Sequence, residues 1–119
     1  SVWGDGTAIR DFIFSKDVAI AMLQLMKINT KNPVNIGSGK GYSIKELVKY
    51  INMYFNNSYK INWDKSKPTG DKIRILDTRF LRKNNVKQNT SLKEGIYETI
   101  EWFKKNNKSQ KRFNIFKNE

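Results

Sequence analysis

Two copies of one helix-starting signal constrain this chain more than any other feature of its sequence. Ser43 lies three residues before Glu46, and Ser91 lies three residues before Glu94. In such a capping box each side chain accepts a hydrogen bond from the free backbone N–H of the other residue, which fixes the first turn of a helix. Apolar residues at helical spacing follow both boxes. The sequence therefore predicts two amphipathic helices, with apolar stripes of Ile44, Leu47, Val48, Ile51 and Phe55 in the first and Leu92, Ile96, Ile100 and Phe103 in the second.

The N-terminal quarter of the chain predicts two extended pieces and a third helix. Residues 2–3 and 9–14 flank the turn-forming residues 4–7, and an Asp-Gly pair between apolar flanks predicts a β-hairpin. Ser15 follows, and its hydroxyl can accept a bond from a free N–H two or three residues further on. We expect it to cap a helix over residues 16–28, where apolar residues recur at helical spacing.

The rest of the chain predicts short strands, a loop and one further short helix. Residues 33–36 and the alternating run 59–64 read as strands, residues 65–72 as a loop, and Asp77 as a helix cap. We expect Trp63 and Trp102 to be aromatics of the core or of the packing between subdomains. A strand followed by a helix is typical of an α/β arrangement, here with helices outweighing strands. The strands are too few and too short to close a sheet of their own.

The charge balance raises the question of a nucleic-acid partner. The 119 residues carry 23 Lys and Arg against 11 Asp and Glu, a formal net charge of +12. Clustered cations neutralise phosphates and release counterions. Only five of the 23 cations are Arg, however, whereas specific phosphate and base contacts favour the planar arginine fork. We therefore expect no nucleic-acid partner.

The absence of cysteine and histidine excludes whole classes of chemistry. No disulfide, thiol nucleophile, Cys/His zinc site or histidine general base is possible. No apolar run approaches the roughly 20 residues of a membrane span, and no signal peptide is visible. We expect no metal site, no membrane partner and a cytoplasmic location.

Four stretches in a fixed order carry a resemblance to a known family. They are VWGDGTAIRDFIFSKDVAIAM (2–22), NIGSGKGYSIKELVKYI (35–51), KPTGDKIRILDTRFLRKN (67–84) and SLKEGIYETIEWFKKN (91–106). Together they resemble the C-terminal part of the extended short-chain dehydrogenases/reductases, which are NAD(P)-dependent epimerases, dehydratases and reductases of nucleotide sugars. Trp3 and the loop KPTGD are most similar to the GDP-L-fucose synthases, which epimerise and reduce a GDP-4-keto-6-deoxymannose with NADPH.

The resemblance implies an α/β fold that is the C-terminal substrate-binding portion of an extended Rossmann-type dehydrogenase/reductase, helix-rich with a few short strands. Residues 1–105 would form this portion, and residues 106–119 a flexible basic tail. The family's Gly-rich cofactor turn and its catalytic YxxxK pair are missing, since no tyrosine of the chain has Lys at +4. We therefore expect the chain to start after the catalytic centre, with no catalytic or cofactor-binding residue, and to be inactive alone. The complete enzyme would bind NADP or NAD and form a homodimer.

The resemblance also implies which residues contact the nucleotide sugar, for which a GDP-sugar is favoured. Arg10 offers a fork that suits a diphosphate, and the indole of Trp3 can stack on the substrate. Arg74 stands where fucose synthases tend to have lysine. The arginine keeps the positive charge but changes the hydrogen-bond geometry, so the nucleotide base and the sugar of the substrate stay undetermined. Further substrate-contact candidates are Val2, Lys67 and Asp71.

Structural alternatives remain open for these residues. Arg10 can equally be a strand arginine that pairs with Asp11 or Asp17, Trp3 a packing aromatic, and Arg74 a solvated cation. We expect Asp11 to be a salt-bridge partner and Asp17 to be a first-turn helix acid that favours the dipole. For the whole chain, one alternative is a stand-alone basic module that binds polyanions or RNA through the Lys-rich residues 104–117. Another is a degenerate remnant that folds poorly.

Overall fold

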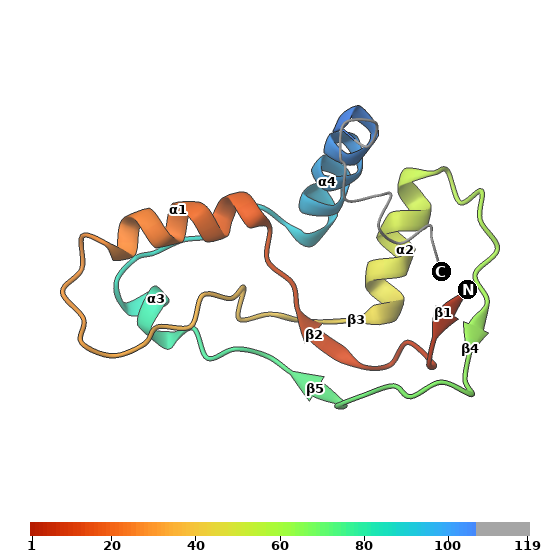
Figure 1. Ribbon diagram of the computed structural model, residues 1–119, viewed down its shortest axis with the longest axis horizontal. Coiled ribbons are helices and arrows are strands. Elements are labelled where there is room, and N and C mark those ends of the chain that lie inside the picture. The colour runs from red at the N-terminus through yellow and green to blue at the C-terminus, as the bar shows by residue number, and fades with distance from the viewer. Residues whose placement is uncertain (107–119) are drawn as a thin grey trace, which may run out of the picture.

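Residues 1–106 are the part of the chain that the computed structural model describes, and they contain four helices and five short strands (Figure 1). The helices are α1 (Ser15–Leu25), α2 (Ile44–Tyr54), α3 (Arg79–Lys83) and α4 (Leu92–Asn106). The strands are β1 (Val2–Trp3), β2 (Ile9–Asp11), β3 (Gly41–Ser43), β4 (Trp63–Asp64) and β5 (Ile73–Arg74). The helix-rich α/β composition that the sequence predicts is confirmed.

The strands form two small sheets by pairing across long stretches of chain. In one sheet β1 runs parallel to β4, with Val2 opposite Trp63. In the other, β2 lies between antiparallel β3 and parallel β5, so that Arg10 is opposite both Tyr42 and Arg74. The predicted hairpin is therefore wrong, because β1 and β2 each take a partner from elsewhere in the chain.

The segment between β1 and β2 is nevertheless a true turn. Asp5 Oδ1 accepts hydrogen bonds from the backbone N–H of Thr7 at 2.9 Å and from its hydroxyl at 2.7 Å. These two bonds lower the pKa of the Asp5 carboxyl below its ordinary value. Asp side chains stabilise turns by such local bonds. The Asp-Gly pair thus predicts a turn correctly without predicting what the flanking strands pair with.

Both predicted capping boxes are confirmed. Ser43 Oγ accepts from the Glu46 N–H at 3.1 Å, while Glu46 Oε2 accepts from the Ser43 N–H at 2.8 Å. At the second box the corresponding distances between Ser91 and Glu94 are 3.3 and 2.9 Å. The bonds from Ser43 and Ser91 hold the pKa of the Glu46 and Glu94 carboxyls below the ordinary value. Because these contacts are local, they form wherever the helix forms.

Three finer predictions of secondary structure are wrong. Helix α1 begins at Ser15 itself after Phe14, and its N-terminus has no side-chain cap bond. Residues 33–36 form no strand, and the strand that leads into α2 is β3. Only Trp63 and Asp64 of the run 59–64 pair as a strand. The two strand predictions failed because strand formation depends on tertiary neighbours that local propensity does not contain.

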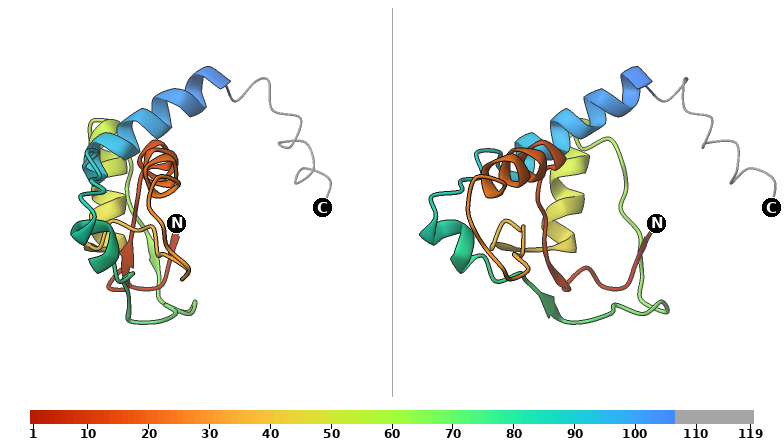
Figure 2. Two further views of the ribbon diagram at one scale, coloured as in Figure 1. Left: turned by 90° about the vertical axis from the view of Figure 1, so that its left-hand side faces the viewer. Right: turned by 60° about the vertical axis from the view of Figure 1, so that its left-hand side comes forward.

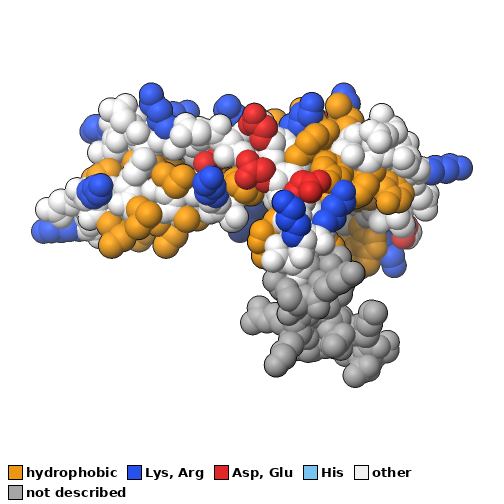
Figure 3. Space-filling view, turned by 90° about the horizontal axis from the view of Figure 1, so that it is seen from above, with side chains coloured by type: hydrophobic (Ala, Val, Ile, Leu, Met, Phe, Trp, Pro, Cys, Tyr) orange, Lys and Arg blue, Asp and Glu red, His pale blue; other side chains and the backbone are white. Residues whose placement is uncertain are grey.

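The buried core is small and lies between α1 and α3. Ala21, Leu81 and Val86 form its centre, and Leu25, Ile28, Val34 and Ile36 pack against them. Helices α2 and α4 pack against each other at the other end of the molecule (Figures 1 and 2). Much apolar surface stays exposed, and Figure 3 shows it mixed with Lys and Arg side chains over one face. Trp102 is 55% exposed and is therefore not a core residue of the described part, whereas Trp63 is half-buried against Gly6.

Candidate functional site

The side chain of Arg10 is held against the loop of residues 65–72. Its Nη1 donates to the backbone carbonyl of Asp71 at 2.7 Å and to that of Ile9 at 2.8 Å. Gly70 has a φ of +70°, and a Cβ at this position would lie 3.2 Å from Arg10 Nη2. Glycine is the residue that adopts this conformation without strain. The loop therefore fixes one side of the guanidinium and leaves its Nε and Nη2 without a bond to residues 1–106.

The structure gathers the other predicted contact residues around the same loop. Arg74, on the strand that leaves the loop, is the register partner of Arg10. Lys67 within the loop places its Nζ 5.6 Å from the ring centroid of Trp3. Trp3 is 68% exposed, so its indole presents a free face. Val2 is half-buried, and its backbone N–H donates to the Asn62 carbonyl at 2.8 Å, within the β1–β4 pairing.

Neither arginine of this cluster pairs with a carboxylate. Among residues 1–106 the ion pairs are Arg79–Asp77 at 2.6 Å and Lys104–Glu101 at 3.7 Å. Like charges opposite each other on neighbouring strands are destabilising. The register pair Arg10–Arg74 is therefore an uncompensated cationic site that suits an anion.

Asp11 is not a salt-bridge partner, contrary to expectation. Its Oδ1 accepts from the N–H of Ser38 at 2.7 Å and from the Ser38 hydroxyl at 2.5 Å. Its Oδ2 accepts from the N–H of Gly39 at 2.9 Å and from that of Leu76 at 3.3 Å. The carboxylate thus ties β2 to the segments on both sides of it. Sequence reasoning missed this role, because nothing near Asp11 in the chain signals donors 27 to 65 positions away.

Asp17 and Asp77 take positions close to those predicted. Asp17 lies in the first turn of α1, is 4% exposed, and accepts from the N–H of Thr90 at 3.0 Å. The N-cap residue of α3 is Thr78, without a side-chain cap bond, so the predicted cap at Asp77 is wrong by one residue. Asp77 instead accepts from the N–H of Arg79 at 2.9 Å, two residues further on. The hydrogen bond from the Arg79 side chain is the main reason why the pKa of Asp77 falls to about 2. Arg79 is consequently paired with a carboxylate, unlike Arg10 and Arg74.

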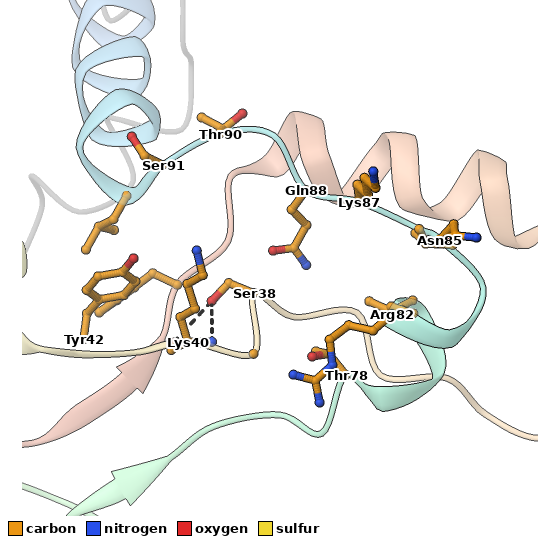
Figure 4. Close-up of a pocket in the computed structure, with 15 residues that line it drawn as sticks. Ser38, Lys40, Tyr42, Thr78, Arg82, Asn85, Lys87, Gln88, Thr90 and Ser91 are labelled. Atoms are coloured by element: carbon orange, nitrogen blue, oxygen red, sulfur yellow. Dashed lines mark hydrogen bonds between the residues drawn. The ribbon is translucent and has the colours of Figure 1, made fainter.

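A pocket of about 430 Å³ lies beside β2 and β3, and sequence reasoning did not predict it (Figure 4). None of the predicted contact residues lines it. Its polar walls come from the segment 38–42, from α3 and from the segment before α4. The sequence signal that was available is the run of cations and amides in residues 82–90. The labelled lining residues are Ser38, Lys40, Tyr42, Thr78, Arg82, Asn85, Lys87, Gln88, Thr90 and Ser91.

No group of three or more His, Cys, Asp or Glu side chains in residues 1–106 is arranged to hold a metal ion. None of the described helices has the length and apolar character needed to cross a membrane.

Comparison with known proteins identifies the family. The family model of GDP-mannose 4,6 dehydratase matches residues 1–110. The chain belongs to this family. A probable GDP-L-fucose synthase 1 from Oryza sativa subsp. japonica is 35% identical to this chain over 112 residues. The match covers 93% of this chain and 34% of that relative. A putative UDP-glucose 4-epimerase from Methanocaldococcus jannaschii is 38% identical to this chain over 110 residues. That match covers 91% of this chain and 35% of that relative.

Solved structures of the same enzyme group share the fold. A GDP-L-fucose synthetase from Naegleria fowleri bound to NADP matches with a TM-score of 0.84 at 28% identity, over 91% of this chain and 35% of that one. The UDP-glucose 4-epimerase of Thermotoga maritima with UDP-glucose matches with a TM-score of 0.77 at 28% identity, over 88% and 35%. The predicted membership of the epimerase/dehydratase family and the extended Rossmann-type fold are confirmed. The chain spans about a third of the length of these relatives.

The predicted basic tail lies almost wholly outside the described residues. Asn106 is the last residue of α4, and residues 107–119 are not described. The alternative function, a polyanion- or RNA-binding module, rests on Lys-rich residues of which most are in this segment. Neither the family match nor the structural neighbours support that alternative.

Proposed function

We propose that residues 1–105 bind the nucleotide sugar in an NAD(P)-dependent sugar epimerase/reductase of the GDP-L-fucose synthase type, with a GDP-sugar as the favoured ligand. The observation that carries the proposal is the register pair Arg10–Arg74, two cations on neighbouring strands with no carboxylate partner among residues 1–106. A diphosphate bound by both side chains would neutralise both charges. Arginine forks bind phosphate oxygens through paired, charge-assisted hydrogen bonds.

Each of the remaining contact residues has a distinct part in this proposal. Asp71 acts through its backbone carbonyl, which orients the Arg10 guanidinium. Trp3 offers an exposed indole face to the sugar or the base, and Lys67 covers the ring from the loop. Val2, whose N–H is already bonded in the sheet, sets the position of Trp3. Holding a substrate in one orientation is a large part of the rate enhancement of enzymes.

The residues present here do not fit a dinucleotide cofactor. The glycines of the sequence NIGSGKG are its nearest approach to a Gly-rich turn. A Cβ on Gly37 would meet Asp11 Oδ2 at 2.8 Å, and one on Gly39 would collide with the Thr78 hydroxyl. Protein atoms therefore fill the space beside these glycines, which leaves no room there for a pyrophosphate. The complete enzyme would accordingly hold NADP or NAD on other residues, and we propose a homodimer for it; the chain alone would bind substrate without turnover.

The proposal is tested by calorimetric titration of the chain with GDP-, UDP- and dTDP-sugars. Because hydrogen bonds to charged groups contribute about 1.5–3 kcal/mol each, Arg10→Gln and Arg74→Gln should each weaken binding by roughly 10- to 150-fold. The matched control is Arg79→Gln, since Arg79 is committed to Asp77 and lies outside the cluster. Equal affinity of the wild-type chain and the Arg10 and Arg74 variants would contradict the proposal, as would an equal loss in the control.

A further inference from the structure

The pocket beside β3 carries three cations that are unpaired in the described part of the chain. Lys40, Arg82 and Lys87 line it, and no Asp or Glu does. Within residues 1–106 none of the three takes part in an ion pair. In Figure 4 Lys40 extends into the space from below, and Arg82 lies at its lower edge next to Thr78. The pocket therefore concentrates positive charge around a space of about 430 Å³.

The nearby carboxylates keep their negative charge, but none of them lines the space. Asp77, whose pKa is lowered in part by attraction to Arg82, is ion-paired with Arg79. Asp11 accepts from Ser38 and Gly39, which line the pocket. Asp17 accepts from the N–H of Thr90, and Glu94 accepts from Ser91. The last three acids hold the walls of the pocket in place.

Neutral donors complete the pocket. Thr78 is 5% exposed as a whole residue, and its side chain lines the space. Gln88 reaches in from the opposite wall and is anchored by its amide to the carbonyl of Gly37. The Tyr42 hydroxyl points into the same space (Figure 4).

We propose that this pocket binds a phosphate group, either as the free anion or on a small metabolite such as a hexose phosphate. Arg82 and Lys40 would hold the phosphate oxygens, Lys87 would add charge at the rim, and the hydroxyls of Thr78 and Tyr42 would donate to it. Charged donors of this kind make the strong hydrogen bonds to phosphate. The space lies within the roughly 300–1,000 Å³ of small-molecule sites. The site is separate from the Arg10–Arg74 pair and goes beyond the proposed function.

The test is an amide ¹H–¹⁵N NMR titration of the chain with inorganic phosphate at constant ionic strength. We expect saturable shifts at residues 38–40 and 88–91, with a Kd on the order of 1 mM. The double variant Lys40→Gln/Arg82→Gln should weaken binding by at least about tenfold. Both side chains are exposed and unpaired, so the variant should keep its helical circular dichroism.

Two controls make the result specific. Lys49→Gln/Lys105→Gln removes the same charge from α2 and α4 outside the pocket and should leave the affinity unchanged. Arg74→Gln should also leave these shifts unchanged, which separates this site from the nucleotide-sugar site. Unsaturable shifts, shifts spread over all surface lysines, or equal losses in the two double variants would overturn the proposal.

Two further ligands define the chemistry. Acetate should bind at least about tenfold more weakly than phosphate, since one carboxylate satisfies fewer of the donors; equal binding by acetate would overturn the assignment to phosphate. Glucose 6-phosphate binding more tightly than inorganic phosphate would identify the occupant as a phosphorylated metabolite. Equal affinities would identify it as the free anion.

Discussion

The carboxylate of Asp11 is the most connected polar group in the described structure, and its replacement gives the sharpest test of the fold. Asp11→Asn keeps the shape but turns one carboxylate oxygen into an NH₂ donor. If that NH₂ takes the Oδ2 position, it faces the N–H groups of Gly39 and Leu76, which lie 2.9 and 3.3 Å from Oδ2. If it takes the Oδ1 position, it faces the N–H and hydroxyl of Ser38. In the first arrangement two donors lose their acceptor. In the second the Ser38 hydroxyl can turn and accept from the NH₂, so only the N–H of Ser38 loses its acceptor.

The magnitude follows from the cost of those donors. A part-buried donor left without its acceptor costs about 1–3 kcal/mol. One or two of them, partly relieved by water, should lower the free energy of unfolding by about 1–4 kcal/mol. Urea unfolding followed by tryptophan fluorescence measures the change. Hydrogen exchange should also accelerate at the amide of Ser38 or at that of Gly39, according to which donor is released.

The matched control for this prediction is Asp5→Asn. Asp5 also accepts from a backbone N–H and a hydroxyl, but both belong to Thr7 in the same exposed turn. We expect a loss of under about 1 kcal/mol there, because water can replace the acceptor. If Asp11→Asn destabilises the chain no more than Asp5→Asn does, Asp11 does not join the three strands.

The remaining predictions concern the core and the helix starts. Leu81→Ala should cost about 2–5 kcal/mol in chemical denaturation, since Leu81 is 1% exposed in the core. Ser43→Ala should cost about 1 kcal/mol and reduce helical circular dichroism, since it removes a cap. Glu46 and Glu94 have a pKa below the ordinary 4.5, so their contribution is present above pH 4.5 and lost as pH falls further. Glu46→Gln should flatten that decline in a series of melting temperatures.

The starts of α2 and α4 were predictable because their causes are local, whereas the predicted side-chain cap of α1 is absent. Ser43 and Glu46 are close in sequence, and the bonds between them need no other part of the chain. Strand pairing has no such local cause. The turn after Trp3 is typical of a hairpin, yet Trp3 pairs with Asp64, and nothing within a few residues of it indicates that partner. Two- and three-residue strands carry too little pattern to specify a register.

The candidate site was predictable as a set of residues but not as an arrangement. The resemblance singled out Arg10 and Arg74, and the structure makes them register partners. That a backbone carbonyl of Asp71 orients Arg10 could not be read from residue types, because every residue has a carbonyl. The pocket of Lys40 and Arg82 was missed for a related reason, since its walls come from segments about forty positions apart.

The parallel pairing of β2 with β5 sets an order of events during synthesis. Arg10 and the carbonyl that orients it are 61 positions apart, with two helices between them. At about 5–20 residues per second, a ribosome needs about 3–12 s to add that length of chain. Helices α1 and α2 can form while β2 still has no neighbour on that side. An edge strand that waits exposed can pair with other chains. Slower translation between Asp11 and Ile73 should therefore lower the soluble yield more than an equal delay after Arg74.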